Sequence, residues 1–316
     1  RLVAALLLGP LGIAAGVGLA AAVRGLMPES PGRFERQSGY RLVEPLLDYE
    51  VAQRMELRVP FLKHRVMALV EEAVRRTRAT RVSVYFRDLH NGPWFGINEK
   101  ELFIPASLLK VPILLAYLKQ AESNPGLLAQ PLAYTADMSV PEPNVRPSQA
   151  IEAGTPYPVE ELLERMIVYS DNRAAAALVR AIDPAALNRT FSDLGLAIPE
   201  VRDADDLITV KAYATFFRIL FNATYLSPEM SEQALDWLAK VEFARGLAAG
   251  VPFGVTVAHK FGERRLETSV QVHDCGIVYC PRSPYLLCVM SRGTDFEPLV
   301  RTTADISRLI YGEICP

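Results

Sequence analysis

Histidine and cysteine are scarce in this sequence, and neither is spaced as a metal site would require. The 316 residues contain four histidines and four cysteines. The cysteines fit no zinc-binding pattern and lie at Cys275, Cys280, Cys288 and Cys315. We expect no metal and no cofactor. The even number of cysteines is compatible with an oxidising compartment, but we interpret them as buried free thiols that act as small apolar residues.

Neither sign of charge is in excess. The chain has 34 Lys and Arg against 36 Asp and Glu, a formal net charge of −2. A nucleic-acid-binding protein usually carries a basic surplus on one face, so we expect no nucleic-acid partner. No repeat at a fixed period is present, which excludes solenoid architectures. With 50% hydrophobic residues, the chain can bury the core of one large domain or two small ones.

A long apolar run is present near the start. Leu2–Val23 contains no charged residue, and about 20 apolar residues suffice for a membrane-spanning helix. We interpret residues 1–24 as a membrane anchor, because the run exceeds the ~7–15 residues of a signal-peptide core. A cleaved signal peptide is the alternative, since Leu19–Ala22 offers small residues for cleavage. Residues 25–60, rich in Pro, Gly and charge, are interpreted as a juxtamembrane spacer.

Helical and strand periodicities follow one another along the rest of the chain. Helices are predicted at Phe61–Arg78, Leu108–Gln120, Glu160–Tyr169, Arg173–Ile182, Pro184–Leu194, Val210–Phe221, Ser231–Val241 and Arg301–Ile314. Strands are predicted at Arg81–Leu89, Trp94–Asn98, Val255–Phe261, Val270–Tyr279 and Tyr285–Ser291. This order predicts an α+β fold, a five-stranded antiparallel sheet flanked by the first and last helices, with an inserted all-α lobe. The cleft between the lobes is the natural place for a site.

A serine and a lysine are spaced as a nucleophile and its base. Ser107 and Lys110 stand three residues apart at the start of an apolar helix, so their side chains share one face. A serine hydroxyl needs an adjacent base to act as a nucleophile. A lysine can serve where burial lowers its pKa, and its apolar neighbours favour burial. By itself the spacing is weak, because a helix cap and a solvated charge produce it too.

Two further segments carry polar groups suited to a substrate. Ser170–Asn172 reads Ser-Asp-Asn after a predicted helix, and it offers a second hydroxyl and an amide. All three residue types also cap helices, which is the alternative interpretation. Lys260–Gly262 reads Lys-Phe-Gly on a predicted strand. It offers a cation and a glycine that lets a substrate backbone approach, or else an edge lysine with a packing glycine.

Taken in order, these segments resemble the signatures of the serine β-lactamase and penicillin-binding-protein superfamily, particularly its class A branch. The signatures are SxxK, SDN and KTG. The first two match in full at Ser107–Lys110 and Ser170–Asn172, and the third matches at two of three positions in Lys260–Gly262. The resemblance covers about Phe61–Ile314. It implies that residues 61–316 form a catalytic domain with the β-lactamase/transpeptidase-like fold.

The resemblance implies acyl transfer through a covalent intermediate. Ser107 would attack the carbonyl of a β-lactam or of an acyl-D-Ala-D-Ala stem peptide of peptidoglycan. Lys110 or Ser170 would take its proton, and Ser170 would pass a proton to the leaving nitrogen.

The same resemblance implies roles in substrate binding for further residues. Asn172 would hold the substrate's side-chain amide, and Lys260 would attract its carboxylate. The oxyanion hole would consist of the backbone N–H groups of Ser107 and of Glu263, the residue after Gly262.

Two departures from the family pattern bear on activity. Phe261 replaces the hydroxyl residue of the third signature, which places an aromatic ring in or beside the cleft or, alternatively, in the core. Class A enzymes also carry a loop with a Glu that activates the deacylating water, and Leu194–Thr209 is too short for that loop. The nearby carboxylates are interpreted as solvated or capping residues and are Glu200, Asp203, Asp205 and Asp206. Without a placed base, the acyl-enzyme is expected to turn over slowly.

These features predict a membrane-anchored serine hydrolase of the class A β-lactamase type, acting outside the cytoplasmic membrane of a bacterium. A penicillin-binding D-Ala-D-Ala peptidase or transpeptidase is the first alternative, and the shortened loop favours it. A non-catalytic cell-wall-binding domain is the second alternative. A binding module has no need for Ser107, Lys110, Ser170 and Lys260 together, which argues against the second alternative.

Overall fold

The described part of the chain covers most of the predicted catalytic domain. A computed structural model describes residues 34–36, 39–49, 58–90, 92–138, 140, 142–196, 206–281 and 283–315. The predicted membrane anchor at residues 1–24 lies outside these ranges and stays a prediction. Within the ranges, no helix has both the length and the apolar character needed to cross a bilayer.

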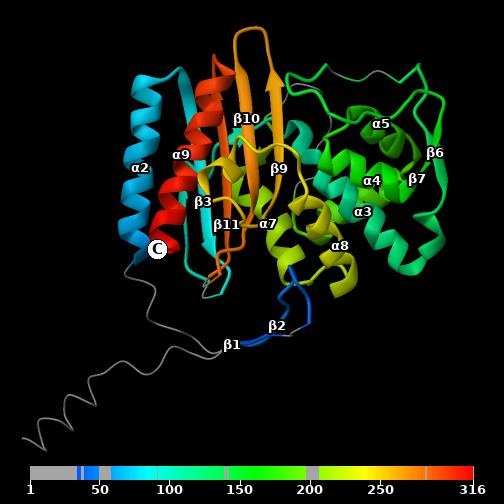
Figure 1. The fold of residues 1–316 in the computed structure, drawn as a ribbon, viewed down its shortest axis with the longest axis horizontal. Coiled ribbons are helices and arrows are strands. Elements are labelled where there is room, and N and C mark those ends of the chain that lie inside the picture. Colours follow the sequence, from blue (N-terminus) through cyan, green and yellow to red (C-terminus); the bar gives the residue numbers. More distant parts are fainter. Residues whose placement is uncertain are drawn as a thin grey trace, which may run out of the picture.

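A five-stranded antiparallel sheet forms the centre of one lobe (Figure 1). Its strand order is β4–β3–β11–β10–β9, and every neighbouring pair is antiparallel. The strands are β3 (Ala79–Asp88), β4 (Trp94–Ile97), β9 (Val257–Arg265), β10 (Val270–Val278) and β11 (Tyr285–Gly293). The early hairpin and the three later strands therefore meet in one sheet, as the sequence predicts.

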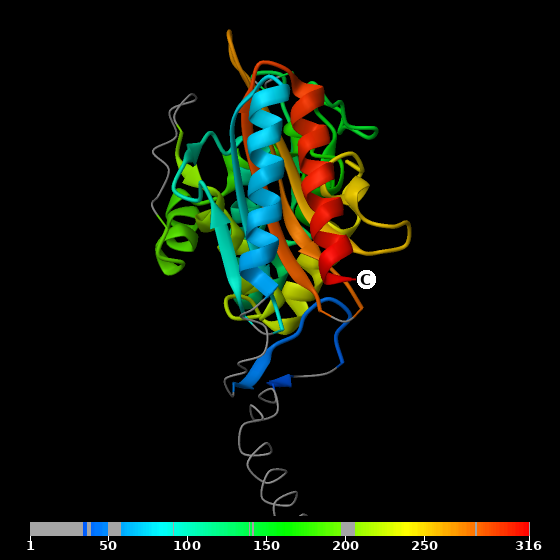
Figure 2. The same cartoon turned by 90° about the vertical axis from the view of Figure 1, so that its left-hand side faces the viewer.

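Two long helices, α2 (Arg58–Arg76) and α9 (Phe296–Ile314), lie side by side over one face of the sheet (Figure 2). On α2, a stripe of buried side chains consists of Leu62, Val66 and Val70. Helix α9 begins five residues before the predicted start. Its first turn contains Pro298, and proline is tolerated there because the first turn has no N–H partners to lose.

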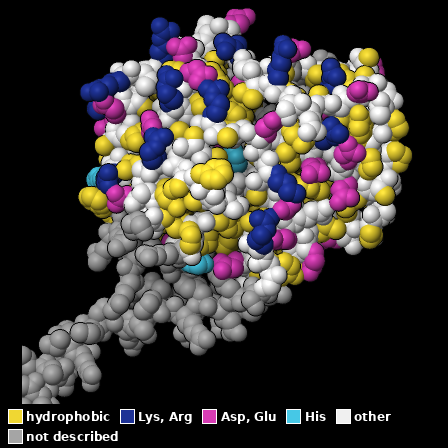
Figure 3. Space-filling model, in the orientation of Figure 1, with side chains coloured by type: hydrophobic (Ala, Val, Ile, Leu, Met, Phe, Trp, Pro, Cys, Tyr) yellow, Lys and Arg dark blue, Asp and Glu magenta, His cyan; other side chains and the backbone are white. Residues whose placement is uncertain are grey.

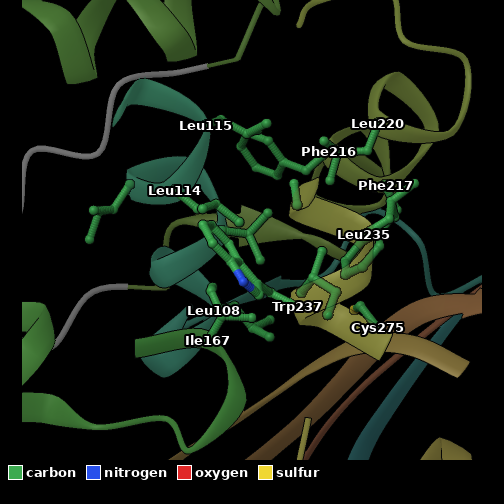
Figure 4. Close-up of a cluster of buried hydrophobic side chains, with 14 of the residues drawn as sticks. Leu108, Leu114, Leu115, Ile167, Phe216, Phe217, Leu220, Leu235, Trp237 and Cys275 are labelled. Atoms are coloured by element: carbon green, nitrogen blue, oxygen red, sulfur yellow. The ribbon is translucent and has the colours of Figure 1, made fainter. Parts of the chain in front are cut away.

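The other lobe is helical and packs on the opposite face and on the β9 edge. It contains η1 (Ala106–Leu109), α3 (Lys110–Ser123), η2 (Pro125–Leu127), α4 (Val159–Val168), α5 (Asn172–Ala181), α6 (Pro184–Asp193), α7 (Val210–Phe221) and α8 (Pro228–Ala239). The short helix η3 (Leu247–Gly250) packs instead against α9. Trp237 lies in the apolar core of the helical lobe with Leu108, Leu114 and Ile167 (Figure 4). The same core reaches Cys275 of β10, so the two lobes are packed together.

Three short strand pairs escape sequence prediction. They are β1 (Phe34–Arg36) with β2 (Leu46–Tyr49), β5 (Leu102–Phe103) with β8 (Ile208–Thr209), and β6 (Pro131–Ala133) with β7 (Pro156–Pro158). Segments of two to four residues are too short to show periodicity. The β5–β8 pair fixes the chain just before the predicted nucleophile.

The four cysteines form two disulfides, so the prediction of free thiols is wrong. Cys275 pairs with Cys288, and Cys280 pairs with Cys315. Cys275 and Cys288 stand directly opposite each other on β10 and β11. Pairing requires Cα atoms brought within a few ångströms by the tertiary fold, which spacing along the chain does not reveal.

Part of the predicted spacer is docked on the helical lobe. Glu232 of α8 accepts hydrogen bonds from the backbone N–H groups of Arg41, Leu42 and Val43, at 2.8 to 3.1 Å. Leu42 and Val43 are buried, and the next N–H, that of Glu44, bonds to the carbonyl of Phe221. These residues are therefore part of the folded unit.

Charges of both signs are interspersed on the surface. On the face in Figure 3, Lys and Arg side chains alternate with Asp and Glu over both lobes. Many form ion pairs, such as Arg41 with Asp236 and Arg180 with Asp137.

Candidate active site

A cavity of about 760 Å³ lies between strand β9 and the helical lobe. Its walls come from η1, the start of α3, the turn between α4 and α5, strand β9 and the loop at residues 142–146. Six of the seven predicted site residues line it, namely Ser107, Lys110, Ser170, Asn172, Lys260 and Glu263. The fold therefore brings together residues that lie up to 156 positions apart in the chain.

Ser107 lies in the short 3-10 helix η1, which runs directly into α3 at Lys110. The residue before it, Ala106, has φ of +50°, a left-handed conformation that is strained for a residue with a side chain. Strain of this kind is kept where the surrounding structure enforces it, commonly at functional sites. The hydroxyl of Tyr213 in α7 donates a hydrogen bond to the carbonyl of Leu108 at 3.0 Å and so anchors η1.

Lys110 is buried and points at the turn between α4 and α5. Its Nζ donates to the carbonyl and the Oγ of Ser170, at 2.7 and 3.1 Å, and to Oδ1 of Asn172 at 2.8 Å. Burial holds the pKa of Lys110 well below its ordinary value, and the charge of Lys260 adds to the lowering, against the carboxylate of Asp171. A lysine acts as a base in its neutral form, and a lowered pKa favours that form.

Lys260 reaches the same hydroxyl from strand β9. It is fully buried, and its Nζ donates to Oγ of Ser170 and to the carbonyl of Phe261, both at 2.9 Å. Burial lowers the pKa of Lys260 from 10.5 to about 7, while the carboxylate of Asp274 acts in the opposite direction. The two lysines therefore share one hydroxyl, and burial lowers the pKa of each amine.

Ser170 lies where these hydrogen bonds converge. Its φ is +55°, a second left-handed residue in the cavity wall. A hydroxyl has two acceptor lone pairs and one proton to donate. When both lysines donate to Oγ, the proton of Ser170 is available to a third group. The hydroxyl of Ser170 can therefore accept a proton from one group and donate its own proton to another.

Of the two residues that follow Ser170, Asp171 has a structural role and Asn172 faces the cavity. Asp171 is buried, and its carboxylate accepts from the N–H groups of Arg173 and Ile151, both at 2.8 Å. It caps helix α5, so for this residue the capping interpretation is confirmed. Asn172 begins that helix, and its Oδ1 faces Lys110, which fixes the orientation of the amide.

Gly262 lies beside the cavity and packs against the nucleophile's helix. A Cβ on Gly262 would lie 3.1 Å from the backbone nitrogen of Leu108. The glycine therefore allows β9 to approach η1 closely, which matches the packing interpretation.

The ring of Phe261 lies in the core, the alternative to a position in the cleft. Only 4% of the residue is exposed. The ring stacks on Phe243 with centroids 3.6 Å apart and meets Phe296 of α9 edge-on. Residue 261 therefore presents no hydroxyl to a substrate.

The side chain of Glu263 has a role that the sequence did not reveal. Its carboxylate accepts from Nδ2 of Asn144 at 2.6 Å and from N–H of Val145 at 2.8 Å. Asn144 and Val145 both line the cavity. Glu263 thus fastens the loop at residues 142–146 to β9 along the cavity wall.

Two buried polar residues of β10, Gln271 and His273, hold the chain before the nucleophile. Oε1 of Gln271 accepts from the N–H of Ile104 at 3.0 Å, and Nε2 of His273 donates to the carbonyl of Ile104 at 2.9 Å. Burial lowers the pKa of His273 to about 4, so its ring is neutral near pH 7. Sequence reasoning missed both, although two polar residues at alternate positions of an apolar strand are the signal that could have found them.

The carboxylates of the shortened loop are largely outside the described residues. Glu200, Asp203 and Asp205 fall there. Asp206 is described, and its Oδ1 accepts from Nε2 of Gln271 at 3.1 Å while Oδ2 pairs with Arg292. Asp206 therefore supports the Gln271 contact and is turned away from the cavity.

His259 of β9 is buried and bonded to a carboxylate. Its Nδ1 lies 2.7 Å from Oδ1 of Asp274, and Oδ2 of Asp274 accepts from the N–H of Leu247 at 2.8 Å. This pair joins β9, β10 and η3 behind the cavity wall.

Comparisons with known proteins agree with the geometry. The curated relatives include the carbapenem-hydrolyzing beta-lactamase KPC of Klebsiella oxytoca, 25% identical over 231 residues, which cover 68% of this chain and 76% of the relative. A beta-lactamase of Streptomyces fradiae is 25% identical over 243 residues, covering 72% of this chain and 78% of the relative.

Solved structures share the fold over most of this chain. A mutant of PBP-A in an acyl-enzyme complex with penicillin G has a TM-score of 0.68 and 25% identity, covering 80% of this chain and 96% of its own. A class A beta-lactamase from Mycobacterium abscessus has a TM-score of 0.67 and 25% identity, covering 79% and 98%. The model of the beta-lactamase enzyme family matches residues 62–314, nearly all of the two lobes. The chain therefore belongs to the beta-lactamase enzyme family.

Proposed function

We propose that this protein is a serine acyltransferase that β-lactams acylate on Ser107, and that its acyl-enzyme is hydrolysed slowly. The observation that carries the proposal is the hydroxyl of Ser170, held by the buried amines of Lys110 and Lys260 in the wall that also contains Ser107. A helix cap and a solvated lysine need no such arrangement. Buried amines that share a hydroxyl are suited to move protons to and from a reacting serine.

The proposed acylation uses these groups in the following order. The neutral amine of Lys110 takes the proton of Ser107, and Oγ forms a bond to the β-lactam carbonyl carbon. The negative oxygen is stabilised by the N–H groups of Ser107 and Glu263, and a donor in such a position typically contributes ~10²–10³ in rate. The carbon–nitrogen bond then breaks, and Ser170 gives its proton to the nitrogen. Lys110 returns a proton to Ser170 across the 3.1 Å contact.

The carboxylate of a β-lactam would be attracted by Lys260. Its ammonium lies in the same wall, and no hydroxyl at residue 261 shares this task. Recognition of the substrate carboxylate therefore rests on charge more than on a hydrogen bond from a side chain at that position.

Slow deacylation is proposed because no base for the hydrolytic water is placed near Ser107 among the described residues. The carboxylates that line the cavity are Glu142, Glu242 and Glu263. Glu263 is committed to the loop at residues 142–146, and Glu242 accepts from the N–H of Ser148. None of the three is hydrogen-bonded to Lys110, whose contacts are to Ser170 and Asn172.

The lack of a placed base near Ser107 among the described residues also favours a second function, a penicillin-binding D-Ala-D-Ala peptidase or transpeptidase. In that reaction an amine or slow water accepts the acyl group of a stem peptide. The similarity to PBP-A, known in an acyl-enzyme complex with penicillin G, supports this alternative.

We also propose that the apolar run within residues 1–24 anchors the protein outside a bacterial cytoplasmic membrane. The two disulfides, which persist in oxidising compartments, support that location.

The full chain in detergent, treated with a fluorescent penicillin and a chromogenic cephalosporin, tests the proposal. Intact mass over time is expected to show a persistent adduct that Ser107→Ala abolishes. Ser192→Ala, on exposed α6, serves as the matched control and is expected to leave the adduct unchanged. Rapid turnover of the cephalosporin would contradict slow deacylation. The absence of any adduct on the unmodified chain would overturn acylation itself.

A further inference from the structure

A second cavity, of about 260 Å³, lies at the other edge of the sheet, between helix α7 and strands β3 and β4. Its lining residues are Tyr85, Arg87, Trp94, Lys211, Ala214, Thr215, Arg218 and Leu286. None of them lines the cavity that contains Ser107. The two cavities are separated by the width of the sheet, because β4 and β9 are its opposite edges.

Three cations surround this second cavity. Lys211 and Arg218 are seven residues apart on α7, so they share one face and are separated by about 10 Å along the helix axis. Arg87 comes from β3 on the opposite wall. No acidic residue lines the cavity.

The positive charge of the cavity is not neutralised within the described part of the chain. Arg87, Lys211 and Arg218 form no ion pair there, whereas most other described arginines do, for example Arg165 with Glu161 and Arg292 with Asp206. Clustered cations without counter-charges repel one another and favour an anion between them. The cluster therefore indicates an anionic ligand.

An aromatic wall adjoins the cations. Trp94 is 41% exposed although it belongs to a sheet strand, and it stacks on Tyr85 with centroids 5.7 Å apart. Trp94 is the register partner of Arg87, and the Nζ of Lys211 lies 4.2 Å from the centroid of the indole. An exposed indole beside cations offers an apolar surface to the carbon skeleton of a ligand whose charged group the cations hold.

We propose that this cavity binds a single sugar-like ring that carries a carboxylate or phosphate group. The oxyanion is held by Arg87, Lys211 and Arg218, and the ring packs on Trp94. The volume lies just under the range of drug-sized ligand pockets, roughly 300–1,000 Å³, which suits one ring. A neutral sugar would leave the cations unpaired, so the charged group is required.

Tryptophan fluorescence tests this site, because the chain has only two tryptophans. Trp237 is in the core of the helical lobe, and Trp237→Phe leaves Trp94 as the reporter (Figure 4). In the full chain with this substitution, glucuronate and glucose 6-phosphate are each expected to give a saturable change in fluorescence. Glucose is expected to give none, and inorganic phosphate is expected to bind more weakly than glucose 6-phosphate.

Variants identify the groups that bind. Lys211→Ala and Arg218→Ala are each expected to weaken binding at least tenfold, and Arg218→Lys to retain most of it. Arg301→Ala, an exposed cation of α9, is the matched control and is expected to have no effect. Near-ultraviolet circular dichroism and the unchanged penicillin adduct on Ser107 check that each variant is folded.

Several results would overturn the proposal. Absence of a saturable change with both anionic sugars up to about 10 mM, confirmed by calorimetry, would exclude the site. Equal affinity for glucose and glucuronate would exclude the role of the cations. Equal affinity for inorganic phosphate and glucose 6-phosphate would exclude the role of the aromatic wall.

Discussion

At the scale of single residues, one hydroxyl organises the chemistry of the main cavity. Ser170 accepts from Lys110 and Lys260, which come from different lobes. Its left-handed backbone conformation turns the side chain toward both amines. The Ser-Asp-Asn tripeptide could be found in the sequence, whereas the sharing of its first hydroxyl by two lysines follows from the fold.

Loss of that hydroxyl is expected to slow acylation without preventing it. Ser170→Ala removes the group proposed to give a proton to the leaving nitrogen, and proton transfer of this kind typically contributes ~10²–10⁴ in rate. The measurement is the second-order rate constant for labelling of Ser107 by a fluorescent penicillin. An unchanged rate constant would show that Ser170 has no role in proton transfer. Ser192→Ala is the matched control.

The pKa of Lys260 predicts how acylation depends on pH. Burial lowers it from 10.5 to about 7, so the charge proposed to attract a substrate carboxylate is lost as the pH rises through about 7. The rate constant for acylation of the free protein is expected to fall on the alkaline side. Lys260→Arg keeps the charge and is expected to remove this fall. A profile that stays flat from about pH 6 to 9 in the unmodified protein would contradict the prediction.

At the scale of elements, the neighbouring strands β10 and β9 both contact the segment that contains Ser107. Gln271 and His273 of β10 hold Ile104, and Gly262 of β9 lets the strand approach Leu108. Residues 104 and 105, between β5 and η1, have no regular secondary structure. Their position therefore depends on these contacts.

Replacement of Gln271 by leucine is expected to affect stability and acylation together. Gln271→Leu leaves the buried N–H of Ile104 without its acceptor, which typically costs about 1–3 kcal/mol. Urea unfolding measures the stability, and penicillin labelling of Ser107 measures the position of the nucleophile. Gln149→Leu, at an exposed loop position, is the matched control. Lower stability with an unchanged labelling rate would show that the contact does not position Ser107.

A methyl group between β9 and η1 is expected to impair the oxyanion hole. In Gly262→Ala the new Cβ would lie 3.1 Å from the nitrogen of Leu108, so β9 and η1 must separate by a few tenths of an ångström. Labelling of Ser107 is expected to slow more than tenfold while the melting temperature changes little. Gly312→Ala of α9, where a Cβ meets open space, is the control. Equal labelling rates in both variants would contradict this role of Gly262.

At the scale of the whole molecule, contacts between residues distant in sequence join segments outside the sheet to the two lobes. Residues 41–44 dock on α7 and α8, and the Cys280–Cys315 disulfide ties the end of α9 to the turn after β10. The docked segment lies between the predicted anchor and the catalytic lobes. A fixed segment there restricts how the lobes can be oriented relative to residues before it.

Loss of the Glu232 carboxylate is expected to release the docked segment. In Glu232→Gln an amide NH₂ replaces one of the oxygens that accept from Arg41, Leu42 and Val43. Hydrogen exchange at these three amides is expected to accelerate at least tenfold, with the rest of the protein unchanged. Glu71→Gln on exposed α2 is the control. Unchanged exchange at the three amides would show that other contacts hold the segment.

The sequence by itself determined most of the elements and the residues that line the main cavity. Periodicity located the five sheet strands and most helices, because side-chain burial repeats every 2 or 3.6 residues. The Ser107, Ser170 and Lys260 segments could be found because each is a local pattern on a recognisable element, and their resemblance to a known family implied acyl transfer.

Only the tertiary structure decided the disulfide pairing, the core position of Phe261, the packing role of Gly262 and the loop contact of Glu263. It also decided the contacts of Gln271 with Ile104 and the second cavity beside Trp94. Each of these depends on strand register or on which residues of distant elements meet. Such contacts are set by the packing of the whole core, and no repeat along the chain records them.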